Sequence, residues 1–141
     1  SESGLNIKYR CITAEKLSNE DKKFDVILNM EVVEHVSNID SFIKNCSNLI
    51  KKDGIMFVAT INKNLKSYMF AILGAEYILR WLPIGTHDWD KFISPQELEA
   101  LVCNENFVFD KLTGVKFDLF NSKWELSNDY SVNYISTFVK N

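Results

Sequence analysis

Residues 24–36, with the sequence FDVILNMEVVEHV, decide the fold of this chain. The stretch opens with a continuous apolar run at residues 26–28, which is typical of a strand buried on both faces of a parallel sheet. It then changes abruptly to acidic side chains and a histidine. Because ligands of open α/β sheets bind just outside the carboxyl ends of the strands, the stretch predicts a functional site directly after this strand.

The acidic residues after this strand have a spacing that admits two interpretations. If the turn is helical, Glu31, Glu34 and His35 stand at positions i, i+3 and i+4 and share one face, where they could bind a divalent cation or transfer a proton. In the alternative, the two carboxylates only favour the positive end of a helix dipole and His35 packs against its neighbours. Spacing alone favours this second interpretation.

The next two segments, together with the strand at residues 24–30, predict a βαβ unit. Apolar residues recur at helical spacing over residues 39–50, with the N-cap offered by Ser37-Asn38, and residues 55–61, IMFVATI, predict a second buried strand. Such a unit is right-handed, and we expect its crevice above Met30 and Thr60, at the carboxyl ends of the two strands.

Other strands are predicted at both ends of the chain. Residues 6–12 alternate well enough for a short strand, followed by a turn or short helix at residues 13–20. Residues 107–112 and 131–139 read as the last two strands. We expect them to form an antiparallel pair at the sheet edge, joined by an excursion over residues 113–129.

Helix ends carry clear signals at two places. Gly54 is free to take the left-handed conformation that ends the helix over residues 39–50. Ser94 is a predicted N-cap, with Pro95 at the first helical position and Glu97 closing a capping box. The second helix should therefore run from Pro95 to about Asn104.

Residues 67–82, SYMFAILGAEYILRWL, are densely apolar. The segment is too short to span a bilayer and carries Glu76 and Arg80 at i, i+4. It is either a buried helix, or a lid or membrane-interface segment of the kind that covers an apolar substrate. A loop follows in which His87 and Asp88 form a candidate proton-transfer pair, because a carboxylate can orient an imidazole and raise its basicity.

Composition excludes some classes of function. The net charge of −3 and the lack of a basic, aromatic-rich cluster argue against a nucleic-acid partner. The three cysteines, Cys11, Cys46 and Cys103, lie far apart and predict reduced thiols in a cytosolic protein rather than a disulfide framework or a zinc site. With 141 residues, we expect residues 1–141 to form a single domain.

Two stretches together resemble a known family. FDVILNMEVVEHV and, at residues 74–98, GAEYILRWLPIGTHDWDKFISPQEL are similar to the ubiquinone-biosynthesis O-methyltransferases, which are class I S-adenosylmethionine-dependent enzymes. The resemblance runs from about Gly4 to Lys140 of this chain and matches the C-terminal portion of the family's sequences. It implies an α/β fold that holds the later strands of a seven-stranded Rossmann-like sheet, with an inserted helix and loop at residues 67–92. The glycine-rich cofactor turn of the family is absent from this sequence.

The resemblance also implies an activity, which is S-adenosylmethionine-dependent O-methylation of a polyprenyl catechol or a demethylubiquinol in ubiquinone biosynthesis. Two alternatives stay open. One is a methyltransferase for another small molecule, and the other is a non-catalytic module that binds lipid or a partner protein.

Site residues follow from the same resemblance. Glu31, Glu34 and His35 match positions assigned to a divalent cation, with magnesium as the first candidate. Two carboxylates with one imidazole suit magnesium or manganese when water completes the shell, and zinc is a further alternative. The cation would bind the catechol oxygens and lower the pKa of the phenol. Alternatively His35 is the general base, oriented by Glu34. His87 and Asp88 fall within the family's matching segment and are further catalytic candidates.

Cofactor and partner contacts are implied as well. Met30 matches a position that lies against the adenosine of S-adenosylmethionine, with Asn29 beside it. The substrate would be a polyprenylated phenol or quinol, and residues 67–82 would contact the membrane, so we expect a cytoplasmic protein peripheral to the inner membrane. The apolar edge of the strand at residues 24–30 predicts self-association or pairing with a missing N-terminal half.

Overall fold

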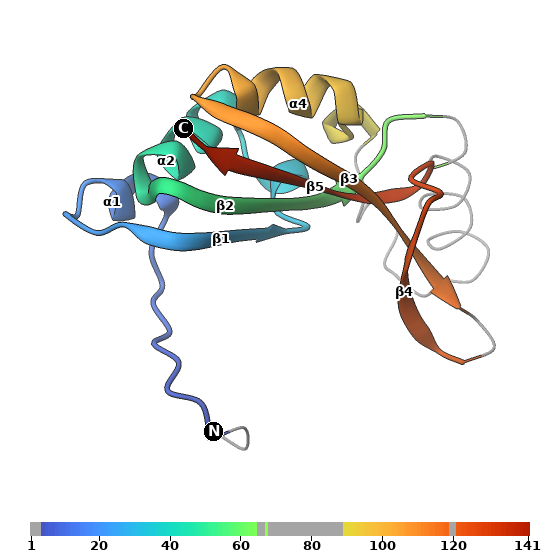
Figure 1. The fold of residues 1–141 in the computed structure, drawn as a ribbon, viewed down its shortest axis with the longest axis horizontal. Helices are drawn as coiled ribbons and strands as arrows, with labels where there is room; N and C mark the ends of the chain where they lie inside the picture. Colours follow the sequence, from blue (N-terminus) through green and yellow to red (C-terminus); the bar gives the residue numbers. More distant parts are fainter. Residues whose placement is uncertain (1–3, 65–66, 68–88, 119–120) are drawn as a thin grey trace.

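The computed structural model describes residues 4–64, 67, 89–118 and 121–141. Within these ranges five strands form one sheet in the order β1-β2-β5-β3-β4, so the chain has a mixed α/β fold (Figure 1). In chain order the elements are α1 (Ala14–Ser18), β1 (Phe24–Met30), the short 3-10 helix η1 (Val33–His35), α2 (Ile39–Leu49), β2 (Ile50–Ile61), η3 (Trp89–Lys91), α4 (Pro95–Cys103), β3 (Phe107–Asp118), β4 (Lys123–Ser127) and β5 (Asn133–Lys140).

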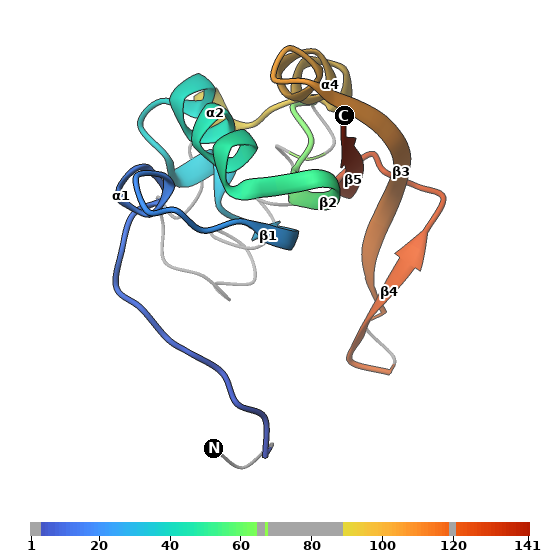
Figure 2. The same ribbon diagram turned by 60° about the vertical axis from the view of Figure 1, so that its left-hand side comes forward.

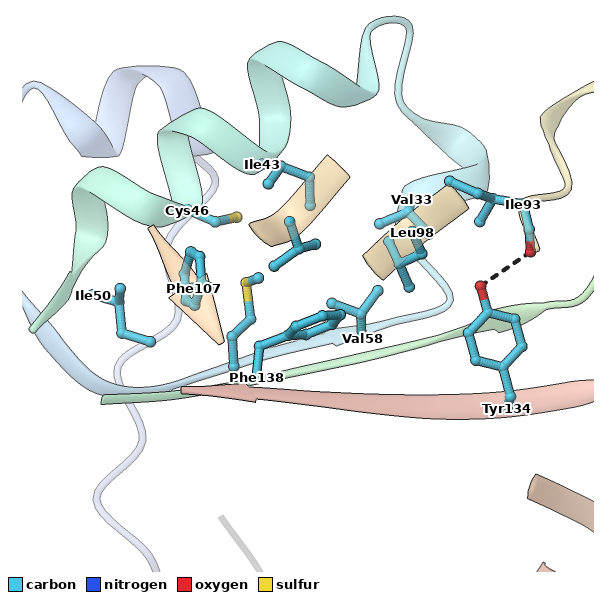
Figure 3. Packing of buried hydrophobic residues seen from close by; sticks show 12 residues of the cluster. Val33, Ile43, Cys46, Ile50, Val58, Ile93, Leu98, Phe107, Tyr134 and Phe138 are labelled. Atoms are coloured by element: carbon cyan, nitrogen blue, oxygen red, sulfur yellow. Dashed lines mark hydrogen bonds between the residues drawn. The ribbon is translucent and has the colours of Figure 1, made fainter. Parts of the chain in front are cut away.

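The helices cover one side of the sheet. Figure 2 shows α1, α2 and α4 together on that side, while the chain ahead of α1 leaves toward the other side. The core fills the space between the helices and the strands (Figure 3). Ile43 of α2, Leu98 of α4, Val58 of β2 and Phe138 of β5 are all fully buried there. The apolar face of each helix is thus packed on the same face of the sheet.

The predicted βαβ unit is confirmed. β1 and β2 are parallel neighbours, in register from Val26 opposite Ile55 to Met30 opposite Ala59. α2 connects them and begins at the predicted N-cap, where the Asn38 side chain accepts a hydrogen bond from the next turn of backbone. The carboxyl ends of the two strands therefore lie side by side.

Gly54 has a different role from the predicted helix stop. α2 ends at Leu49, and the left-handed residue is Asp53, with φ of 60°. A Cβ on Gly54 would lie 2.7 Å from the Ile50 side chain and 3.0 Å from the Asp25 carbonyl oxygen. Glycine is needed here because β1 and β2 approach closely, and not because of its φ angle.

The C-terminal strands are antiparallel as predicted, but their order differs. β5 lies between β2 and β3, and β4, inside the predicted excursion at residues 113–129, forms the edge. β5 can occupy an inner position because it alternates Tyr134, Ser136 and Phe138, all fully buried, with half-buried residues. The excursion therefore holds a strand of its own.

The prediction for α4 is confirmed at its start. The Ser94 hydroxyl caps the helix, and the Glu97 carboxylate accepts a hydrogen bond from the Ser94 backbone N–H at 2.9 Å, which closes the capping box. Tyr134 of β5 donates a hydrogen bond from its hydroxyl to the Ile93 carbonyl oxygen at 3.0 Å. These bonds fix the start of α4 over the sheet.

Residues 6–12 are not a strand in the structure, contrary to the prediction. Leu5, Ile7 and Tyr9 are exposed, and α1 begins directly after this segment, as expected. An ion pair between Arg10 and Glu20, at 2.8 Å, ties the segment to the turn after α1. A strand is stable only with a hydrogen-bonded neighbour, and none of the described strands lies beside residues 6–12.

β1 also departs from its prediction, because only one of its faces is buried. Asn29 faces α2 and is 5% exposed, whereas Val26 and Leu28 on the other face are 49% and 63% exposed. The apolar run is what a doubly covered strand requires, but the described residues cover it on the helix side alone.

The inserted segment predicted at residues 67–92 lies outside the described residues, apart from Ser67 and residues 89–92. In the ranges that the structure describes, no helix combines the length and apolarity needed to cross a membrane.

Candidate functional site at the carboxyl ends of β1 and β2

The chain leaves β1 through a left-handed turn. Glu31, the first residue after the strand, has φ of 54°, and its backbone N–H donates a hydrogen bond to the Ala59 carbonyl oxygen of β2 at 3.0 Å. η1 follows immediately, with its N-cap at Val32. The polar residues after β1 are thus held against the end of β2, where the sequence predicts a site.

Glu34 anchors the site. It is 4% exposed, and its Oε2 accepts a hydrogen bond from the Oγ1 of Thr60, a fully buried residue of β2, at 2.8 Å. A buried carboxylate is stable only with such a donor. The bond between Glu34 and Thr60 therefore fixes η1 over the carboxyl end of the sheet.

Glu31 and Glu34 form an acidic pair. Partial desolvation, then a hydrogen bond with Glu34 and repulsion from its charge, raise the pKa of Glu31 to about 8, although the residue as a whole retains contact with solvent. The same mechanism acts in other carboxylate pairs, because two adjacent carboxyl groups resist simultaneous ionisation. The acidic pair can therefore hold or accept a proton near neutral pH.

Tyr134 lies close to the acidic pair. Burial first, and then the negative charge of Glu34, raise the pKa of Tyr134, so its hydroxyl stays protonated and donates to Ile93. Tyr134 pairs with Thr60 across β5 and β2, which places both side chains on the helix side of the sheet. Apart from its place in a predicted strand, no feature of the sequence indicated a role for this tyrosine.

His35 is separate from the buried part of the site. It ends η1 and is exposed, and the hydrogen bond of the Glu34 carboxylate goes to Thr60. Glu31 lies before η1, so the helical spacing that would place Glu31, Glu34 and His35 on one face is not present. The parts of the chain that the structure describes hold no cluster of three or more His, Cys, Asp or Glu side chains suited to a metal ion.

The two predicted cofactor contacts lie on opposite faces of β1. Met30 is the last residue of the strand and is 50% exposed. Asn29 is buried on the helix side, where its Nδ2 contacts the Cys46 Sγ at 3.8 Å. Of these two residues, Met30 is the one whose side chain is accessible to a ligand, on the face of β1 opposite the helices. The remaining predicted catalytic residues, His87 and Asp88, lie outside the described residues.

A set of hydrogen bonds after β2 was not predicted. The side chain of Asn62 donates to the Tyr130 carbonyl oxygen at 3.0 Å, and that of Asn64 donates to the Ser131 carbonyl oxygen at 2.6 Å. The buried hydroxyl of Ser67 bonds to the backbone of both asparagines. These bonds join the end of β2 to the start of β5, and the only sequence signal is a cluster of polar residues after an apolar strand.

A cavity of about 400 Å³ opens beside the site. It lies between η1, η3 and the start of α4, and its lining is mostly apolar with a few charged side chains: Val33, Val36, Ser37, Ile39, Asp90, Lys91, Phe92, Ile93, Glu97 and Leu101. Such a mixture is typical of small-molecule sites.

Sequence comparisons give close relatives. Residues 1–58 match a family model described as a methyltransferase domain. The chain is 58% identical over 137 residues to a protein of Pelagibacter ubique (strain HTCC1062) named ubiquinone biosynthesis O-methyltransferase, a match that covers 97% of this chain and 57% of the relative. A protein of the same name from Parvibaculum lavamentivorans is 49% identical over 136 residues, which cover 96% of this chain and 54% of that relative. The chain thus spans about half the length of these curated relatives.

Solved structures share the fold. The chain is similar, with a TM-score of 0.67 and 16% identity, to the plantazolicin methyltransferase solved in complex with a triazolic desmethylPZN analog and SAH; the match covers 99% of this chain and 62% of that one. At this identity the likeness concerns the fold alone. By sequence and fold together, the chain is a homologue of the ubiquinone biosynthesis O-methyltransferases, with the fold of the class I S-adenosylmethionine-dependent methyltransferases.

Proposed function

We propose that this chain forms part of an S-adenosylmethionine-dependent O-methyltransferase that methylates a phenolic oxygen of a polyprenyl catechol or a demethylubiquinol. The observation that carries the proposal is 58% identity, over 97% of the chain, to a protein named ubiquinone biosynthesis O-methyltransferase. It is supported by the acidic pair, which lies where α/β enzymes bind their ligands.

The acidic pair would take the proton of the phenol. Glu34, held by Thr60, lies beside Glu31, and partial desolvation together with this neighbour raises the pKa of Glu31 to about 8; a base with a pKa close to the working pH is the most effective proton acceptor. Removing the phenolic proton leaves the more nucleophilic oxygen needed for methyl transfer. His35 is the alternative acceptor, since it is exposed at the end of η1 beside the buried Glu34.

S-adenosylmethionine, when bound, supplies an electrophilic methyl group. In this chain Met30 would pack against its adenosine, because that side chain is exposed at the carboxyl end of β1. The mostly apolar cavity beside η1 would receive the ring and the start of the prenyl chain.

A divalent cation held by Glu31, Glu34 and His35 stays a prediction from the family resemblance. The described residues provide an adjacent pair of carboxylates there rather than three assembled ligands, so no step of the proposed reaction passes through a metal.

Membrane contact through residues 67–82 belongs to the same proposal, because a polyprenyl substrate partitions into lipid. The protein would then be cytoplasmic and peripheral to the inner membrane. Deleting residues 67–82 should abolish binding to anionic liposomes in a flotation assay, and unchanged binding would contradict the assignment.

A chimera tests the proposed reaction. The matched 137 residues of the Pelagibacter ubique relative are replaced with those of this chain, and methyl transfer from S-adenosylmethionine to a polyprenyl catechol is measured. We expect activity in the chimera and a loss of at least tenfold on Glu31→Gln, with Lys44→Gln on the exposed side of α2 as the control. A folded chimera that binds quinol or lipid without transferring a methyl group would favour a non-catalytic module.

A further inference from the structure

The hairpin of β3 and β4 projects beyond the rest of the sheet (Figure 1). β5 begins at Asn133, opposite Val115, so the part of β3 after Val115 pairs with β4 alone. Among the described strands, β4 pairs only with β3, and its other edge is free. The backbone of β4 can therefore form hydrogen bonds with a further strand.

One face of this hairpin is apolar. Trp124 and Leu126 of β4 are 64% and 72% exposed, and Phe117 of β3 is 37% exposed. Phe117 lies opposite Trp124, with ring centroids 5.2 Å apart, and Val115 lies opposite Leu126. Because opposite residues of neighbouring strands share a face, these four side chains form one apolar patch on the hairpin.

The other face of the hairpin carries charges of both signs. Lys116 lies opposite Glu125, with 3.9 Å between its Nζ and the Glu125 Oε2, and Asp118 lies opposite Lys123. Lys116, Lys123 and Glu125 are exposed. Two cations and two carboxylates give this face no excess of positive charge, so it does not attract an anionic membrane surface.

β4 is complementary to an antiparallel second copy of itself. When Trp124 is placed opposite Trp124 of the second copy, Lys123 lies opposite Glu125 on either side of it. The charged row across the four strands then alternates in sign, from Lys116 and Glu125 to Lys123 and Asp118 of the second copy. The aromatic rows join too, because Phe117 contacts Trp124 in each copy. Opposite charges and aromatic pairs are contacts that stabilise neighbouring strands.

Other registers of this strand pair are less favourable. A pair centred on Glu125 would place two carboxylates opposite each other, which is destabilising. A shift by one residue would place Trp124 opposite Glu125 and mix the apolar and charged faces of the two hairpins. The charges of β4 thus select one register, and they also disfavour strands of other sequence.

The interface through β4 would be small. At roughly 200 Å² for a fully exposed side chain of this size, Phe117, Trp124 and Leu126 together expose roughly 350 Å² in each copy, against about 800 Å² per partner in a standard interface. Interfaces of this size belong to the weak and transient class. We therefore expect monomer and dimer to be in equilibrium.

We propose that β4 binds a second copy of this chain, antiparallel and centred on Trp124, so that the sheet of one copy continues into the other. The proposal does not depend on the proposed reaction, because it uses no residue of the acidic pair or of the cavity beside η1. The free edge of β1 offers a different route of self-association, and the experiment distinguishes the two routes.

Paired charge reversals test the proposed register. Lys123→Glu places like charges opposite each other at both ends of the strand pair, and Glu125→Lys does the same. In an equal mixture of the two variants, every charge of one chain lies opposite an unlike charge of the other. Sedimentation equilibrium up to about 1 mM protein, where even a weak dimer is populated, measures the dissociation constant of each variant and of the mixture.

Each variant alone should have a dissociation constant raised by about tenfold or more, and the mixture should return to within about threefold of the unsubstituted chain. Lys44→Glu, on the exposed side of α2, is the matched control and should leave the dissociation constant unchanged. Both tested positions are exposed, so we expect folded variants, which circular dichroism checks.

Three results would overturn the proposal. The first is a chain that stays monomeric at about 1 mM protein. The second is a dimer that neither charge reversal weakens; if Leu28→Lys abolishes that dimer, the association belongs to the edge of β1, where Leu28 is exposed. The third is a mixture of two folded variants that does not recover the dimer, which would exclude the register centred on Trp124.

Discussion

Replacing Thr60 with valine tests the hydrogen bond that organises the site. Thr60 is fully buried, and its hydroxyl donates to the Glu34 carboxylate at 2.8 Å. Valine has nearly the same shape, so the packing is kept and the donor alone is lost. Because Glu34 is only 4% exposed, water cannot easily replace the donor. A hydrogen bond to a charged group contributes about 1.5–3 kcal/mol, so we expect Thr60→Val to lower the free energy of unfolding by about 2 kcal/mol at pH 7.

Urea denaturation followed by circular dichroism measures this change, with an unaltered m-value if the unfolded state is unaffected. The control is Thr137→Val, at a half-buried position of β5 on the opposite face, where we expect a change within about 0.5 kcal/mol. If Thr60→Val costs no more than Thr137→Val, the Glu34 carboxylate does not depend on Thr60 and the described organisation of the site is wrong.

Three further substitutions have defined outcomes. Glu31→Gln should stabilise the protein increasingly as pH rises from about 5 to above 8, because the folded state of the unsubstituted protein holds a proton on Glu31 that its unfolded state has lost. After discounting for solvent exposure, we expect a gain of about 1–2 kcal/mol in the free energy of unfolding, which thermal melts at pH 5 and 9 measure. Ser136→Ala should raise the free energy of unfolding by about 1 kcal/mol in urea, since its buried hydroxyl has no partner among the described residues, and a lower stability would reveal a missed bond. Gly114→Ala should cost at least about 3 kcal/mol and lower soluble expression, because the new Cβ would lie 2.0 Å from the Asp129 carbonyl oxygen; a normal melting temperature would show that this contact is not close.

Elements with local determinants could be predicted from the sequence. The capping box of Ser94 and Glu97 and the N-cap Asn38 act within one turn of helix, so their residues fix their structure. The parallel pair of β1 and β2 also follows from short-range information, because a strand, an amphipathic helix and a second strand have one common arrangement.

Elements that depend on distant partners could not be predicted in the same way. Residues 6–12 have a strand pattern, but none of the strands that the structure describes lies beside them. β1 has the composition of a doubly covered strand, and the described residues cover one of its faces. The position of β5 between β2 and β3 depends on pairings far apart in the chain, which alternation alone does not specify.

The candidate site shows the same division between position and detail. Strand direction places the polar residues after β1 beside the end of β2, and this was predictable. Which of these side chains come together was not predictable. The left-handed Glu31 and the short η1 replace the expected helix, so Glu31, Glu34 and His35 do not have the i, i+3, i+4 relation of one helix face. What remains is an acidic pair fixed by Thr60, with His35 exposed beside it. Proton transfer therefore has more support from this geometry than metal binding, and the separate responses of Glu31→Gln and His35→Ala in the active chimera would decide which residue accepts the proton.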